Sequence, residues 1–363
     1  MHFGAAYSAL YALLLVGSEG ALQPLATPDV ICHRTSLLRG PPDMSAANYS
    51  QIVVVGDIHG ALNNLLTVLH AADIVASPGK CEWSTTARSV LLVQTGDVVD
   101  RGPQATEAWA CLQRLQRQAG VSGSRVVRLV GNHELLWLQD DTGYRNLKHD
   151  TDEKVSMLQE SMRQDIQAGT LQASFYVEAF MGIPLFFSHA GLRPQMLHQL
   201  TARSPTRSPE PLALSAFVND KLRLDVSHCL HRVCLFKDAI YSVGAERGGR
   251  EIGGIFWTDY AVLEKAAIAS RGGNERGGTG DSALPSLSSP WAVVQIVGHT
   301  LSLGRVRAAR GLHSICVDVG LYLGGQGWLE IAPSGHFLAH EYSTRSGEGW
   351  QVRDLTVEMC QAR

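Results

Sequence analysis

Three short apolar runs, each ending in a glycine that polar residues follow, constrain the fold of this chain most strongly. They are QIVVVGDIHGAL (51–62), SVLLVQTGD (89–97) and RVVRLVGNHELLWL (125–138). A helical pattern follows each run, and the leucines of ALNNLLTVLHAA share one helical face after the first. Strands that alternate with helices are typical of a layered α/β domain. Open sheets of this kind carry functional residues at the carboxyl ends of their strands.

The pattern extends over most of the chain, and we expect one large domain over residues 50–342. Residues 150–171 have the periodicity of an amphipathic helix, SFYVEAF and IPLFFSHAGL that of a hairpin, and strands return from residue 291. Stretches rich in serine, proline or glycine predict loops near 201–211 and 270–290. Residues 343–363 are expected to form a C-terminal tail.

The N-terminal segment differs from this pattern. FGAAYSALYALLLVG (3–17) has no charge, but its 15 residues fall short of the roughly 20 that a transmembrane helix needs. Small residues at 18 and 20 offer a cleavage site, so we expect a signal peptide over residues 1–20 and no stable membrane span after its removal. An uncleaved anchor and a buried strand are the alternatives. The expected location is the secretory pathway or another membrane-bounded compartment.

The net charge indicates which partners to expect, and the cysteines indicate which cross-links or metal sites are possible. The net charge is −3 and no block of lysine or arginine is present, so nucleic acid is not expected as a partner. The seven cysteines leave at least one unpaired in a monomer. Cys229 and Cys234 are close enough in sequence to form a disulfide, although a helix would place them on different turns. The segment HCLHRVC could instead bind zinc.

Polar residues at the expected strand ends have the chemistry of metal ligands. In chain order they are Asp57, His59, Asp97, Asp100, Asn132, His133, His189 and His299. Imidazole nitrogens and carboxylate oxygens suit manganese, iron and zinc, and no cysteine is present among them to form a thiolate site. A single strand-end histidine is more often structural than a ligand, but five such motifs in one order point to a site. The residues outnumber the ligands of one tetrahedral ion, so we predict two ions that share a carboxylate.

The order of these motifs resembles that of a known family. GDIHG, GDVVDRG, GNHE, HAG and GHT are similar to the phosphoprotein phosphatase branch of the calcineurin-like metallophosphoesterases, over about residues 50–342. FSHAGL and VDVGLYLGGQGWLEI are most similar to the Shewanella-like protein phosphatases, and the SAPNY element of the eukaryotic serine/threonine enzymes is absent. The resemblance implies an α/β metallophosphoesterase fold: a central β-sandwich flanked by helices, with a dinuclear metal site at the carboxyl ends of strands.

The resemblance also implies an activity and a role for each residue. The activity is metal-dependent hydrolysis of phosphomonoesters in phosphorylated proteins or peptides, by in-line attack of a hydroxide that bridges two manganese, iron or zinc ions. The implied ligands are Asp57 and His59 for the first ion, Asp97 as the bridge, and Asn132, His189 and His299 for the second. His133, oriented by Asp100, would be the general acid. Arg101 would hold phosphate oxygens with its planar guanidinium.

One segment departs from the family pattern. Relatives carry a second phosphate-binding arginine in a segment resembling GPxWxRxY, whereas this chain has GGIFWTDY (253–260) with Thr258 at that position. Arg247 or Arg250, in the glycine-rich run before it, could substitute, or both could lie on a solvated loop. The sequence therefore does not identify a second phosphate-binding arginine, called here the second phosphate clamp.

Two other functions compete with the phosphoprotein phosphatase. A diadenosine tetraphosphate-type hydrolase uses the same scaffold and shares the HAG motif, but the DRGP segment (100–103) and the GNHE glutamate favour the phosphatase. A non-catalytic binding module is disfavoured because every expected ligand and the acid are present. The preference for phosphoserine, phosphothreonine or phosphotyrosine does not follow from the sequence.

Overall fold

The computed structural model describes residues 49–87, 89–229, 233–265, 293–309, 314–344 and 349–361. The expected signal peptide over residues 1–20 and the expected loop at 270–290 lie outside these ranges. Within them, no helix combines the length and the apolar character needed to cross a membrane.

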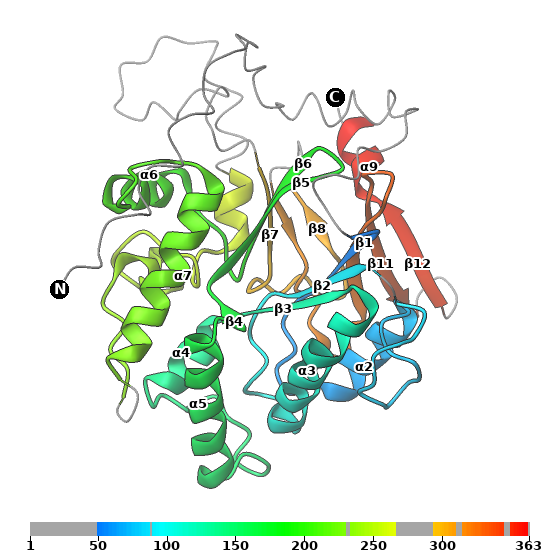
Figure 1. The fold of residues 1–363 in the computed structure, drawn as a ribbon, viewed down its shortest axis with the longest axis horizontal. Helices are drawn as coiled ribbons and strands as arrows, with labels where there is room; N and C mark the ends of the chain where they lie inside the picture. The colour runs from blue at the N-terminus through cyan, green and yellow to red at the C-terminus, as the bar shows by residue number, and fades with distance from the viewer. Residues whose placement is uncertain are drawn as a thin grey trace, which may run out of the picture.

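A seven-stranded mixed sheet carries the three apolar runs (Figure 1). In spatial order its strands are β12 (Gly349–Asp354), β11 (Phe337–Ser343), β10 (Gly327–Ile331), β1 (Gln51–Val55), β2 (Val90–Gln94), β3 (Arg125–Leu129) and β4 (Leu171–Gln172). Strands β1 to β4 are parallel, whereas β10, β11 and β12 are antiparallel to their neighbours. The runs are apolar because β1 and β2 are covered on both faces and nearly all of their residues are buried.

A five-stranded sheet forms the second layer. In spatial order its strands are β5 (Ser174–Phe180), β6 (Ile183–Ser188), β7 (Val294–Val297), β9 (Ser314–Cys316) and β8 (Arg307–Ala308). The predicted hairpin is confirmed, because β5 and β6 pair in antiparallel register. Val54 of the first sheet and Phe187 and Ile296 of the second belong to one continuous buried core. The layered α/β expectation is therefore confirmed.

Helices flank the two sheets. The α-helices are α2 (Leu62–Ala71), α3 (Ala105–Ala119), α4 (Asn132–Leu138), α5 (Asp152–Gln167), α6 (Pro194–Arg203), α7 (Pro211–Ser227) and α9 (Leu355–Gln361), with short 3₁₀ turns η1 (Gly120–Ser122), η2 (Ala239–Tyr241), η3 (Ala245–Arg247) and η4 (Leu321–Leu323). Figure 1 shows α2 and α3 below β1, β2 and β3, with the five-stranded sheet above them. Helix α5 matches the predicted amphipathic helix, with Val155, Leu158 and Met162 buried.

Two boundaries differ from the expectation. The loop expected at 201–211 is shorter, because α6 continues to Arg203 and α7 begins at Pro211, where the ring of proline suits the first helical turn. Part of the expected C-terminal tail, residues 349–361, forms regular structure. Strand β12 pairs with β11 and α9 follows it, because Arg353 binds Glu341 and Trp350 packs edge-to-face on Trp328.

The cysteines form two disulfides within the described ranges, Cys81–Cys111 and Cys229–Cys234. Helix α7 ends at Ser227, so the second pair lies beyond the helix and is free to close. The zinc alternative for HCLHRVC is therefore wrong, because both of its thiols are oxidised. Cys316 is a buried thiol.

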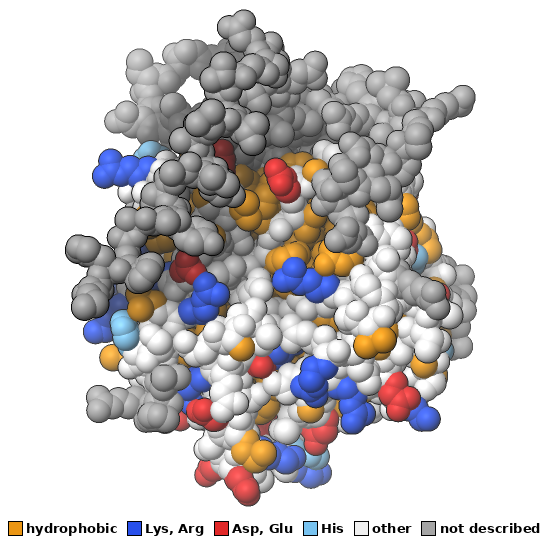
Figure 2. Space-filling view, in the orientation of Figure 1, with side chains coloured by type: hydrophobic (Ala, Val, Ile, Leu, Met, Phe, Trp, Pro, Cys, Tyr) orange, Lys and Arg blue, Asp and Glu red, His pale blue; other side chains and the backbone are white. Residues whose placement is uncertain are grey.

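Figure 2 shows one face of the molecule with its charged side chains. On the described part of this face, basic side chains lie among acidic ones rather than in one continuous stripe.

Candidate functional site

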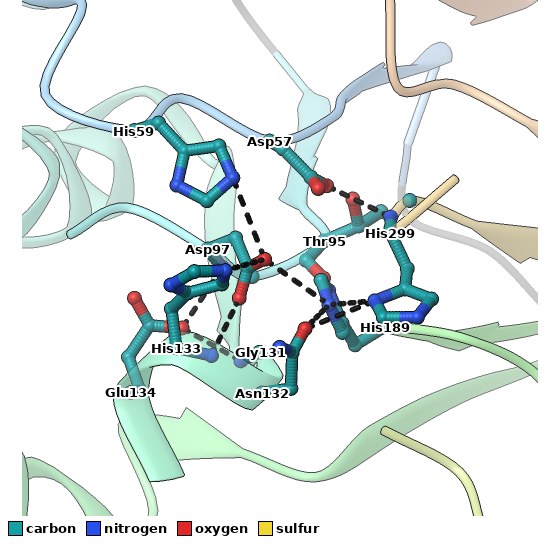
Figure 3. A network of polar contacts seen from close by, with 12 residues as sticks. Asp57, His59, Thr95, Asp97, Gly131, Asn132, His133, Glu134, His189 and His299 are labelled. Atoms are coloured by element: carbon teal, nitrogen blue, oxygen red, sulfur yellow. Dashed lines mark hydrogen bonds and ion pairs between the residues drawn. The ribbon is translucent and has the colours of Figure 1, made fainter. Parts of the chain in front are cut away.

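The structure brings the predicted ligands together at one edge of the sheets (Figure 3). Asp57 and His59 follow β1, Asp97 follows β2, Asn132 and His133 open α4, His189 follows β6, and His299 follows β7. All seven side chains are buried. Because the parallel strands end at the same edge, residues far apart in sequence meet there. The placement agrees with the expectation, and the metal-ligand roles stay predictions.

Asp97 lies at the centre of the cluster. Its Oδ2 atom is 3.6 Å from Nε2 of His59, 3.5 Å from Nε2 of His189 and 3.9 Å from Nε2 of His133. Two groups of possible ligand atoms, each within 4.8 Å of one another, share this carboxylate: His59, Asp97 and His133, and Asp97, His189 and His299. The first group contains His133, the predicted acid, and neither group contains Asp57, a predicted ligand. A carboxylate shared by two groups is the arrangement that a pair of ions needs.

Backbone carbonyls fix the orientation of two of the imidazoles. His59 Nδ1 donates to the carbonyl of Val99 at 2.8 Å, and His189 Nδ1 donates to the carbonyl of Thr95 at 2.9 Å. Each Nε2 atom therefore faces Asp97. Metal-ligating histidines are usually oriented in this way.

One amide oxygen of the cluster lies between two imidazoles. Asn132 Oδ1 lies 2.8 Å from Nε2 of His189 and 2.9 Å from Nδ1 of His299. The buried Nε2 of His299 has no hydrogen-bond partner among the described residues. A buried imidazole nitrogen without a partner is an open ligand position for a cation. Together with the imidazole, carboxylate and amide donors, this arrangement fits a pair of manganese, iron or zinc ions.

The protein environment lowers the pKa of three of the predicted ligands. Burial lowers the pKa of His59 to about 3, so this imidazole is neutral at pH 7. Burial and the neighbouring His189 hold the pKa of His299 well below its usual range. Burial alone would raise the pKa of Asp97, but His189 and His133 outweigh it and hold that pKa well below its usual range. A metal ligand must be deprotonated, and these three groups are.

The pKa values of two other predicted ligands are raised. Burial raises the pKa of Asp57, and for His189 burial opposes the charged form but Asp97 outweighs it and raises the pKa.

Five candidate residues have an uncommon backbone conformation. Positive φ angles occur at His59 (47°), Asp97 (57°), Asp100 (73°), Arg101 (64°) and His299 (66°). A non-glycine residue in this region costs about 1–3 kcal/mol and persists where the surroundings hold it, often at functional sites. These five are among the eleven non-glycine residues with positive φ in the described part of the chain.

Close backbone approach explains the glycines that precede the ligands. A Cβ atom at Gly131 would lie 2.1 Å from Oδ1 of Asp97, and one at Gly298 would lie 2.3 Å from Oδ1 of Asp57. Neither carboxylate could keep its place beside a larger residue.

Glu134 is a positioning residue that the sequence analysis did not assign. Its fully buried carboxylate accepts the backbone N–H groups of Asp97 and Val98, both at 2.8 Å, and of Gly131 at 2.7 Å. It ties the Asp97 turn to the start of α4. The GNHE motif was the available signal, because a glutamate in the first turn of a helix can accept such N–H groups.

His133 has the partners of a general acid. Its Nδ1 contacts Oδ2 of Asp100 at 2.5 Å, and Trp137 Nε1 donates to Oδ1 of the same carboxylate at 2.6 Å. Burial opposes the charged imidazole, but Asp97 and Asp100 outweigh it and raise the pKa of His133 above its usual range. A protonated histidine can supply a proton near neutral pH.

Arg101 lies beside this histidine. Its Nη2 atom is 3.3 Å from Nε2 of His133, and its Nη1 atom donates to the Tyr322 hydroxyl at 2.6 Å. The guanidinium also lies 4.8 Å from the centre of the Tyr322 ring. Tyr322 was not singled out from the sequence. Its signal was its place in VDVGLYLGGQGWLEI, where η4 presents it.

Thr258 does not replace the expected arginine. Its side chain is fully buried, and its hydroxyl donates to the carbonyls of Gly253 and Gly254 at 2.9 and 3.0 Å. The next residue, Asp259, accepts a bond from Nε of Arg247 at 2.8 Å and one from the Thr300 hydroxyl at 3.2 Å. Arg247 is thus anchored beside the His299 loop.

Part of the chain is similar to known phosphoesterases. Residues 50–246, more than half of the chain, match the family model described as calcineurin-like phosphoesterase. A 98-residue segment is 37% identical to Shewanella-like protein phosphatase 1 of Plasmodium berghei and covers 27% of this chain and 26% of that protein. A 94-residue segment is 32% identical to Shewanella-like protein phosphatase 2 of Arabidopsis thaliana and covers 26% of this chain and 23% of that protein. The chain therefore matches about a quarter of the length of these relatives.

A solved structure extends the likeness in fold. The structure of a cold-active protein tyrosine phosphatase superposes with a TM-score of 0.57 at 18% identity, covering 85% of this chain and 80% of the other. At this identity the likeness concerns the fold. Because the family model matches more than half of the chain, the chain belongs to the calcineurin-like phosphoesterases.

Proposed function

We propose that the protein is a metal-dependent phosphoprotein phosphatase that hydrolyses phosphomonoesters. The observation that carries the proposal is the Asp97 carboxylate shared by two groups of histidines, with Arg101 and His133 beside it. The resemblance to Shewanella-like protein phosphatases supports the substrate class. The metal ions proposed are two of manganese, iron or zinc.

The chain's own residues divide the work. Metal ions held by the six predicted ligands would supply Lewis acidity and neutralise negative charge on the phosphate. Arg101 binds phosphate oxygens with its guanidinium, whose position Tyr322 fixes. His133 gives a proton to the leaving oxygen, and Asp100 holds its imidazole in place. Phosphoryl transfer depends mainly on positioning and charge, which these groups provide.

Metal removal and restoration test the proposal. Purified protein is stripped with a chelator, and phosphate release from phosphopeptides is measured after manganese, iron, zinc or magnesium is added back singly. We expect no release from the stripped protein and restored release with at least one ion. Release from fully stripped protein at the original rate would contradict the proposal.

Diadenosine tetraphosphate is the competing substrate in the same assay. Its hydrolysis in preference to every phosphopeptide would favour the dinucleoside polyphosphate hydrolase, with which the chain shares the HAG motif. We expect the phosphopeptides to be preferred, because the aspartate and arginine of DRGP fit a phosphatase.

We expect Arg247 to supply the second phosphate clamp. A charge-assisted hydrogen bond contributes about 1.5–3 kcal/mol, so Arg247→Ala should lower kcat/KM by about tenfold or more. Arg250→Ala is the matched control, because both arginines are exposed on the same loop but only Arg247 is bound to Asp259 beside the His299 loop. Steady-state kinetics and the metal content of both variants show whether Arg247 binds phosphate. Equal kinetics for Arg247→Ala and the wild type would leave Arg101 as the only arginine of the clamp.

We propose that the mature chain enters the secretory pathway or another membrane-bounded compartment. The apolar segment 3–17 and the two disulfides support this, because disulfides persist in oxidising compartments. Mass spectrometry of the native protein should find a new N-terminus near Ala21. Recovery of intact Met1 from a cytosolic fraction would contradict the prediction.

A further inference from the structure

Two tyrosines from different loops flank the proposed catalytic groups. Tyr322 of η4 meets His59 edge-to-face, with ring centres 5.0 Å apart. Tyr144, in the loop between α4 and α5, meets His133 edge-to-face at 5.3 Å. The same loop touches Arg101 through its backbone, since the Arg101 N–H donates to the Tyr144 carbonyl at 3.1 Å.

The two tyrosines differ in what they bind. The Tyr322 hydroxyl is committed to the Arg101 guanidinium, so Tyr322 acts on the phosphate side of a substrate. The Tyr144 side chain is 59% exposed even though its ring contacts a histidine that is 4% exposed. An aromatic side chain this exposed next to a buried acid has a free surface to offer a ligand.

The position of the general acid shows where a leaving group must lie. On its Nδ1 side, His133 is closed off by Asp100, behind which Trp137 packs. The ring of His59 meets His133 edge-to-face with centres 4.7 Å apart, which closes another side.

The leaving oxygen must reach Nε2 of His133, and a general acid works within hydrogen-bond reach of that oxygen. Nε2 lies 3.3 Å from Nη2 of Arg101, on the proposed phosphate side. Tyr144 is an exposed side chain that contacts the same imidazole ring, so it lies beside the path of the atoms attached to the leaving oxygen.

We propose that Tyr144 is a specificity-determining residue that contacts the leaving group of the substrate. The inference rests on the proposed phosphatase activity and on the role of His133 as acid. The Tyr144 ring favours leaving groups that carry a flat or apolar group next to the ester oxygen. Aromatic contacts of this kind change affinity by about 3- to 10-fold. We expect the change in KM rather than in kcat.

The test compares leaving groups of different size in single-residue variants. Phenyl phosphate presents an aromatic leaving group, and ethyl phosphate presents a small one. Tyr144→Ala should raise KM for phenyl phosphate about 3- to 10-fold while kcat is unchanged. For ethyl phosphate, KM should stay within about twofold, and so should the inhibition constant of inorganic phosphate, which has no leaving group. Tyr144→Phe keeps the ring and should retain the KM of the wild type.

Two further variants separate this role from other causes. Leu147→Ala is the matched control, because Leu147 lies on the same loop and is 79% exposed. Tyr322→Phe removes the hydroxyl that holds Arg101. It should therefore weaken the binding of inorganic phosphate and of both esters by the same factor. Thermal unfolding of each variant confirms that the chain is folded.

The outcomes are distinguishable. Equal losses for phenyl and ethyl phosphate in Tyr144→Ala, or no loss for either, would overturn the assignment of Tyr144. Wild-type protein that releases phosphate from neither ester nor from phosphopeptides, with its metal sites filled, would instead overturn the proposed function.

Discussion

Asp97→Asn is expected to abolish nearly all phosphatase activity and to release metal from both predicted sites. Replacing a residue that only orients a ligand costs about 10- to 100-fold in metal affinity, and Asp97 is predicted to bind both ions directly. We therefore expect a loss in kcat/KM of more than about 10²-fold. Asparagine keeps the size and the acceptor oxygen that the His133 N–H uses, but it removes the negative charge.

Metal content per chain, measured by elemental analysis, checks this prediction together with the rate. Asp354→Asn is a matched control, since Asp354 also accepts backbone N–H groups, at Thr356 and Val357, but lies at the end of β12. The control should keep both metal and rate. An Asp97→Asn variant with normal metal content and normal turnover would show that the two-metal interpretation is wrong.

His133→Asn is expected to lower the rate by roughly 10²–10⁴ while metal content stays unchanged, because general acids contribute about this much. The distances alone leave two roles open, since Nε2 of His133 lies 3.9 Å from Oδ2 of Asp97 and within one of the possible ligand groups. The bond from Nδ1 to Asp100 and the raised pKa favour the acid.

The dependence on leaving group separates the two roles. A p-nitrophenolate leaving group needs little protonation, so the loss in His133→Asn should shrink markedly with p-nitrophenyl phosphate compared with an alkyl phosphate. If the variant instead loses metal and is equally slow on both substrates, His133 is a ligand and the acid lies elsewhere.

The sequence was sufficient to predict the layers of the fold and the strand-end residues that lie together. Both predictions rest on local signals: apolar runs that end in glycine, helical periodicity, and polar residues directly after each strand. Neighbouring parallel strands end at one edge, so residues such as His59 and Asp97, which follow β1 and β2, had to approach one another once the strands were assigned. The resemblance added their roles, which only metal and rate measurements can test.

Other features depended on the tertiary structure, because they join segments whose approach no local pattern encodes. Arg101 and Tyr322 are 221 residues apart, and nothing near either residue indicates their bond. The anchoring of Arg247 by Asp259 and the approach of Tyr144 to His133 depend in the same way on how loops pack. Strand β12 was missed because half-buried edge strands carry a weak alternation, and its place was decided by pairing with β11. The sequence by itself thus determined which chemical groups meet at the strand ends, and the packing of loops decided which side chains surround them.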